Sequence, residues 1–183
     1  MLVSCYMYHG TRFTAAAWIP EIACTSLIMC GGGRGEDHSL FVNGEWRCFS
    51  LWVPPVAARP APVVIMHHGR DSGAGQLCNH FATDQAQEHG FALLCTQAVG
   101  GNWRFGGLPW WEGGDGFGKG SSVYSNACSD SDSNDLAYVR QVYAYLHQWP
   151  AFDAQRIYHV GFSQGALFAA CMTTREPNMS SAL

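Results

Sequence analysis

The stretch "RIYHVGFSQGALFAA", from Arg156 to Ala170, decides the fold. Its first residues are largely β-branched or aromatic and predict a buried strand, whereas the alanines after Gly165 predict a helix. Between them lies the pattern Gly161-Phe162-Ser163-Gln164-Gly165. A serine between two glycines at a strand-to-helix turn is the arrangement of a nucleophile elbow, which exposes the serine hydroxyl above the edge of a sheet. Ser163 is therefore the candidate catalytic nucleophile.

The two elbow glycines have a steric explanation. A side chain at Gly161 or Gly165 would collide with the neighbouring strand or helix while Ser163 is held in a strained backbone conformation. The next residue, Gln164, opens the helix, so its backbone N–H is expected to point at the oxyanion that develops on a substrate carbonyl. Gln164 is therefore the first candidate for an oxyanion hole.

A second oxyanion donor is expected from the loop after an earlier strand. The stretch "MHHGRDSG" (66–73) has that position, because Gly69 lets the chain turn so that the Arg70 N–H faces inward. His68 is interpreted as a structural histidine rather than a catalytic one. Arg70 thus completes the predicted oxyanion hole.

The rest of the chain predicts an α/β sheet. Asn43-Gly44 lies between two β-rich runs and predicts an antiparallel hairpin. Continuous apolar runs predict buried strands at 63–68 and 91–98, and helical spacing appears at 76–90, which Gly90 ends, and again from Leu136 to Leu146, with 131–133 as capping candidates. Alternation of strand and helix at these lengths predicts a mainly parallel sheet flanked by helices.

The connection over residues 99–134 is too long for a simple turn. It leaves the carboxyl end of a predicted parallel strand and is rich in glycine and aromatic residues, which favours a loop that covers the substrate, with Trp103, Trp110 and Trp111 as its candidates. A P-loop reading of "GGDGFGKG" (113–120) fails because Gly120 stands where Ser or Thr must reach magnesium. "DSDSND" (130–135) is better explained as an acidic helix start than as a calcium loop.

Composition limits the function further. The 183 residues fit one domain, with 1–37 unassigned and 38–183 as the folded domain. A net charge of −4 leaves no basic stripe for nucleic acid or anionic lipid. The apolar run 13–30 is either a signal segment or a poorly ordered N-terminus, and it is too short and interrupted to span a bilayer.

Eight cysteines permit disulfides, but no CxxC pair predicts a zinc site, so we expect no metal and no cofactor. Cys95, inside an apolar run, is interpreted as a buried thiol. The number and spacing of the cysteines are compatible with both an oxidising and a reducing compartment.

The ordered motifs "VNGEWRCFSLWVPP", "VVIMHHG", "HGFALLCTQA", "SDSNDLAYVRQVYAYL" and "FDAQRIYHVGFSQGALFAA" resemble the α/β-hydrolase esterases grouped with polyhydroxybutyrate depolymerases and feruloyl esterases. The resemblance spans about residues 40–170. It implies that the chain has the N-terminal part of an α/β-hydrolase fold and that Ser163 attacks an ester carbonyl, with Gln164 and Arg70 as oxyanion donors. Relatives of this kind are often secreted, which favours an extracellular location and disulfides.

The family's triad order places an Asp and then a His after the serine. The 20 residues that follow Ser163 contain neither, and Glu176 is their sole carboxylate. Upstream, His67, His68 and His159 are the substitutes considered for a base, but strand alternation and distance argue against a productive contact with Ser163. We therefore expect a C-terminally truncated serine esterase for polyester or feruloyl-type esters. The alternative is a catalytically inactive, vestigial hydrolase-like binding protein.

Overall fold

The computed structural model describes residues 5–6, 12–13, 30, 33–104 and 134–180. Two short strands near the N-terminus, β1 (Cys5–Tyr6) and β2 (Arg12–Phe13), pair with each other in antiparallel fashion. The main sheet has five strands in the order β3-β4-β6-β5-β7. Their bounds are β3 Glu36–Val42, β4 Glu45–Trp52, β5 Ala61–His67, β6 Ala92–Thr96 and β7 Phe152–Gly161.

The predicted hairpin forms β3 and β4, which pair along the whole of β3, from Glu36–Leu51 to Val42–Glu45. Asn43 and Gly44 have φ values of 49° and 86°, so both central residues of the turn lie in the left-handed region. Positive φ at both positions defines the type I′ turn, whose twist matches that of the flanking strands. The Asn-Gly signal therefore indicated the turn and the antiparallel hairpin correctly.

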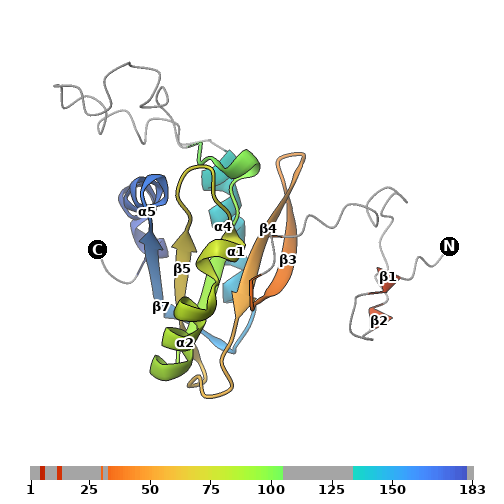
Figure 1. The fold of residues 1–183 in the computed structure, drawn as a ribbon, viewed down its shortest axis with the longest axis vertical. Helices are drawn as coiled ribbons and strands as arrows, with labels where there is room; N and C mark the ends of the chain where they lie inside the picture. The colour runs from red at the N-terminus through yellow and green to blue at the C-terminus, as the bar shows by residue number, and fades with distance from the viewer. Residues whose placement is uncertain (1–4, 7–11, 14–29, 31–32, 105–133, 181–183) are drawn as a thin grey trace.

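The other strands confirm an α/β fold with a mixed sheet. β6, β5 and β7 run parallel to one another, whereas β4 pairs with β6 in antiparallel fashion. The helices are α1 (Ala74–Leu77), α2 (His80–His89), α4 (Asn134–His147) and α5 (Gln164–Arg175), with 3-10 turns η2 (Val99–Gly101) and η3 (Pro177–Met179). The carboxyl ends of β5, β6 and β7 thus meet at one edge of the sheet (Figure 1).

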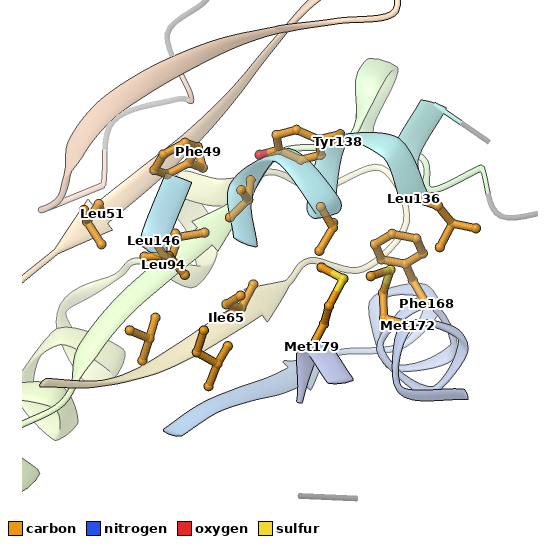
Figure 2. Close-up of a cluster of buried hydrophobic side chains, with 14 of the residues drawn as sticks. Phe49, Leu51, Ile65, Leu94, Leu136, Tyr138, Leu146, Phe168, Met172 and Met179 are labelled. Carbon is orange, nitrogen blue, oxygen red and sulfur yellow. The ribbon is translucent and has the colours of Figure 1, made fainter. Parts of the chain in front are cut away.

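Alternate residues of β5 separate two apolar layers. Val63 and Ile65 belong to the larger cluster, which includes Leu136 of α4 and Phe168 of α5. Figure 2 shows this cluster between the strands and the two helices. On the opposite face, Met66 packs against a smaller cluster that includes residues of α1 and α2. The central strands are therefore buried on both faces, as their continuous apolar sequences predict.

Two disulfides tie the smaller cluster together. Cys30 is bonded to Cys48 with Cα atoms 5.8 Å apart, and Cys78 is bonded to Cys95 with Cα atoms 5.9 Å apart. Cys171 is disulfide-bonded as well, and no described cysteine is a free thiol. The interpretation of Cys95 as a buried thiol is therefore wrong. Its apolar strand indicated burial correctly, but sequence did not show that Cys78 lies opposite it.

The helix predicted for 76–90 is two helices. Asn79 interrupts it, because its side chain accepts the Ala82 N–H and caps α2. Gly90 ends α2 with a φ of 71°, as predicted. The capping candidates at 131–133 and the stretch 113–120 lie outside the described residues, as does nearly all of the apolar run 13–30.

Candidate active site

The elbow at the end of β7 holds Ser163 in an unusual backbone conformation. Its φ of 53° and ψ of −118° lie in a region that non-glycine residues rarely occupy. Although Ser163 precedes the first residue of α5, its hydroxyl makes no capping hydrogen bond. The side chain is exposed, so the strained turn leaves the hydroxyl available to a ligand.

The two elbow glycines lie in contact with main-chain atoms. A Cβ added at Gly161 would stand 2.2 Å from the carbonyl carbon of Gly165, and one at Gly165 would stand 2.1 Å from the carbonyl oxygen of His67. Backbone on the other side of each contact cannot yield as a flexible side chain can. The Phe162 N–H also donates to the His67 carbonyl at 3.1 Å, so the elbow is pinned to the end of β5.

Ser163 opens on a pocket of about 400 Å³, called here the serine pocket. The loop after β5 forms one wall with Gly69, Arg70 and Asp71, and Phe162 lies beside Ser163. The structure therefore brings Ser163 and Arg70 to the same pocket. The Arg70 side chain forms an ion pair with Asp71 at 3.2 Å.

Asp71 is a pocket residue that sequence reasoning missed. Its φ is 54°, and its carboxylate accepts a hydrogen bond from the Asn102 side chain at 3.2 Å. Its own N–H donates to the Gly101 carbonyl at 2.9 Å. Strained non-glycine residues gather at functional sites. The sequence "GRDSG" alone, however, did not indicate that Asp71 adopts a positive φ.

The His68 ring holds the loop after β5 in place through two hydrogen bonds. The Ala98 N–H donates to its Nε2 at 3.0 Å, so Nε2 must be unprotonated. The ring proton then lies on Nδ1, which donates to the Gly69 carbonyl at 2.6 Å. Burial, the largest cause, lowers the pKa of His68 and favours this neutral form. The interpretation of His68 as structural agrees with this geometry.

Gln164 contributes in two ways. Its backbone N–H belongs to the first turn of α5, where no earlier helical carbonyl is available, and it donates to no described acceptor. Its buried side chain forms a reciprocal pair with Trp103: Oε1 accepts the Trp103 N–H at 3.1 Å, and Nε2 donates to the Trp103 carbonyl at 3.3 Å. The start of the long connection is thereby fastened to the elbow.

Trp103 does not lie over the serine pocket. It is 3% exposed, stacks on Phe168 with ring centroids 4.5 Å apart, and donates its Nε1–H to the His68 carbonyl at 2.8 Å. The expectation that Trp103 covers substrate is therefore corrected, because the ring fills the core beneath the elbow. Trp110 and Trp111 lie outside the described residues.

The other candidate bases are engaged elsewhere. His67 Nδ1 lies 2.8 Å from the Thr96 hydroxyl, and His67 Nε2 lies 3.0 Å from His159 Nδ1. His159 Nε2 donates to the Met179 carbonyl at 3.1 Å. Burial is the main cause that lowers both pKa values, that of His159 to about 4. Neither ring has a hydrogen bond to Ser163 in the described structure.

Glu176, the sole carboxylate after Ser163, is also occupied. It forms an ion pair with Arg140 of α4, which donates to it through Nε at 2.8 Å and through Nη2. Within the described ranges, no three His, Cys, Asp or Glu side chains gather as a metal site. None of the described helices is long and apolar enough to cross a lipid bilayer.

Comparison with known proteins gives likeness in structure alone, since no family model and no curated protein matches the sequence. The acetyl xylan esterase from Aspergillus awamori superposes with a TM-score of 0.59 at 15% identity, covering 81% of this chain and 50% of its own. An S-formylglutathione hydrolase from Agrobacterium tumefaciens gives 0.54 at 20% identity, covering 79% and 53%. A thermostable esterase gives 0.54 at 18% identity, covering 80% and 39%.

These similarities establish the fold. The described core is of the α/β-hydrolase type, and the chain spans about half the length of the solved structures it matches. The elbow, the loop after β5 and the pocket between them lie at the carboxyl edge of the parallel strands, where sheets of this class bind ligands.

Proposed function

We propose that this chain carries the nucleophile and the oxyanion hole of a carboxylic ester hydrolase. One observation supports this most strongly: Ser163 stands in a strained turn between two glycines whose close contacts exclude a side chain, and it opens on a pocket shared with Arg70. Strain of this kind persists only where the surrounding structure enforces it. An ordinary surface serine has no need of it.

In the proposed reaction Ser163 Oγ attacks the ester carbonyl carbon. The Oγ–C bond forms, the proton of the hydroxyl passes through a base to the departing alcohol oxygen, and the ester C–O bond breaks to leave an acyl-enzyme. Water then releases the carboxylic acid by the same steps. The N–H groups of Gln164 and Arg70 would hold the negative oxygen of each tetrahedral intermediate, and removal of one such donor typically costs about 10²–10³ in rate.

The base is the part that the described residues do not supply to Ser163. His67, His68 and His159 are held by other partners. We propose that a histidine and its acidic partner come from outside the described residues, consistent with a chain that spans about half the length of its structural neighbours. Without an imidazole the hydroxyl stays protonated and a weak nucleophile.

The acyl group would lie against Phe162 and Leu77, the two apolar side chains of the serine pocket. A pocket of about 400 Å³ accommodates a short hydroxyacyl unit or a feruloyl group, so the proposed substrates are polyester or feruloyl-type esters. Trp110 and Trp111 remain proposed as cover for this group.

Two buried disulfides in one apolar cluster further support an extracellular or otherwise oxidising location, because such bonds are rare where thiols are kept reduced.

A fluorophosphonate probe tests the proposal, because it phosphonylates activated serines. We expect slow labelling of this chain at Ser163, acceleration by added imidazole as a substitute base, and none in Ser163→Ala. Ser72→Ala is the control, since Ser72 lines the same pocket but does not have a positive φ. If imidazole leaves labelling unchanged, or if Ser72→Ala abolishes it, the nucleophile assignment is wrong. A chain that never reacts would instead fit the inactive, hydrolase-like binding protein.

A further inference from the structure

The segment after α5 carries a short acceptor pattern for a covalent modification. Asn178, Met179 and Ser180 read Asn-X-Ser, with X other than proline, which is the pattern that accepts N-linked sugar chains. The sequence has six asparagines, and none of the other five has serine or threonine two positions later. A pattern of three residues is weak by itself, so its place in the fold decides whether it can serve as a site.

The structure turns the asparagine outward and its neighbour inward. Asn178 is exposed on η3, whereas Met179 is 8% exposed and belongs to the larger apolar cluster. Figure 2 shows Met179 among the side chains of that cluster. A bulky, hydrophilic group on Asn178 would therefore extend into solvent, while Met179 continues to fill the core. N-linked glycans require a surface position of this kind.

The backbone of the turn is held without using the Asn178 side chain. The Asn178 carbonyl accepts the Tyr143 hydroxyl at 2.8 Å, and the Met179 N–H donates to the Glu176 carbonyl at 2.8 Å. His159 Nε2 donates to the Met179 carbonyl at 3.1 Å. These three hydrogen bonds use main-chain groups of η3, so attachment of a sugar at the Asn178 amide nitrogen breaks none of them.

An independent observation points to the compartment in which such sugars are attached. Cys30 is bonded to Cys48 and Cys78 to Cys95, and all four residues are at most 2% exposed. Disulfides form and persist in the oxidising secretory pathway and are rare in the cytosol. The same pathway of eukaryotic cells transfers N-linked glycans, so the disulfides and the acceptor pattern agree on one location.

We propose that Asn178 is an N-glycosylation site. In the transfer, the Nδ2 atom of Asn178 loses a proton and forms a bond to the anomeric carbon of an oligosaccharide. The bond from that carbon to a lipid-linked diphosphate breaks, and the proton is released with the lipid diphosphate. The glycan stands apart from the ester site, because none of residues 176–180 lines the serine pocket. It therefore requires no catalysis at Ser163.

The test directs the full chain into the secretory pathway of a yeast with a host leader. A peptide-N-glycosidase, used in heavy-oxygen water, releases the glycan and converts the modified asparagine to an aspartate that carries the heavy oxygen. Mass spectrometry of the tryptic peptide that follows Arg175 then reports the occupancy of Asn178. We expect this label at Asn178, and a loss of mass of the whole protein on treatment with the enzyme.

Four variants separate the acceptor pattern from its surroundings. Asn178→Gln and Ser180→Ala should lack the glycan, whereas Ser180→Thr, which keeps the pattern, should retain it. Ser181→Ala is the matched control, because Ser181 lies one position beyond the pattern. Cell extracts are analysed together with the medium, since the sugar is attached before export and a variant that is not secreted still gives a result.

The proposal is overturned if Asn178 of the wild-type chain is unmodified, or if the loss of mass persists in Asn178→Gln. It is also overturned if Ser181→Ala removes the glycan as Ser180→Ala does. Fluorophosphonate labelling of the same proteins should be equal in Ser180→Ala and wild type. A glycan without labelling of Ser163 retains this site and rejects the esterase, and labelling without a glycan does the reverse.

Discussion

Replacing Arg47 by methionine should cost the fold about 4 kcal/mol at neutral pH, in the range found when a buried pair loses one partner. Arg47 Nη2 donates to Asp135 Oδ1 at 2.6 Å, and the two side chains are 1% and 3% exposed. The guanidinium also donates to the Asn134 and Gln97 carbonyls, at 3.3 and 3.1 Å, and lies over the Tyr138 ring. Methionine fills the space but removes the donor that Arg47 supplies to these oxygens.

The cost should depend on pH, because the orphaned group can take up a proton. Burial is the largest cause and raises the pKa of Asp135, whereas Arg47 and the Arg104 N–H oppose the rise. Without Arg47 the folded-state pKa must rise further above its unfolded value. The folded variant then binds a proton more readily than the unfolded chain, so its deficit relative to wild type shrinks by about 1.4 kcal/mol for each pH unit between that pKa and the lower pKa of Asp135 in the wild type.

Urea unfolding of both proteins, followed by circular dichroism, at about pH 7 and about pH 5 measures this difference. Arg34→Met is the matched control, since the Arg34–Asp84 pair is exposed at 44% and 67% and such pairs contribute about 0–1 kcal/mol. A cost of Arg47→Met no larger than that of the control would refute the reasoning. A cost that does not change between the two pH values would refute its electrostatic part.

Two further predictions concern the elbow and the layer beneath it. Gly165→Ala should unfold the chain or strongly lower its melting temperature, whereas Gly69→Ala should be milder, because its Cβ would meet the Phe162 ring at 3.0 Å and a carbonyl oxygen only at 3.4 Å, against 2.1 Å at Gly165. Equal melting temperatures would refute the steric account. The chain should also lose stability in acid: His67 and His159 have folded-state pKa values below the unfolded 6.5, chiefly through burial. Stability is therefore complete above about pH 6.5 and falls below it, by roughly 3 kcal/mol for His159 near pH 4. His159→Gln should flatten this part of the curve of unfolding free energy against pH, and an unchanged curve would contradict the assignment.

Short sequence motifs predicted the turns whose conformation depends on the residues within the motif itself. Asn43-Gly44 specified a turn because two positive φ values suit those residues, and Gly161 and Gly165 specified the elbow because a Cβ fits at neither position. The sequence around Arg47 did not indicate that its side chain forms a buried ion pair. Its partner Asp135 lies 88 residues further along the chain, and only the packing of α4 against the hairpin brings the charges together.

Trp103 shows why aromatic content misled the sequence interpretation. An aromatic residue just after a strand end has the same composition signal whether it covers a ligand or fills the core. Here the ring stacks on Phe168, and its backbone is held by Gln164. Trp103 therefore holds the start of the long connection in a fixed position beneath the elbow. Because Trp103 Nε1–H also binds the carbonyl of His68, whose ring holds Gly69, one buried side chain links the elbow to the loop carrying Arg70. The spacing of the two proposed oxyanion donors therefore depends on a buried residue that does not line the serine pocket.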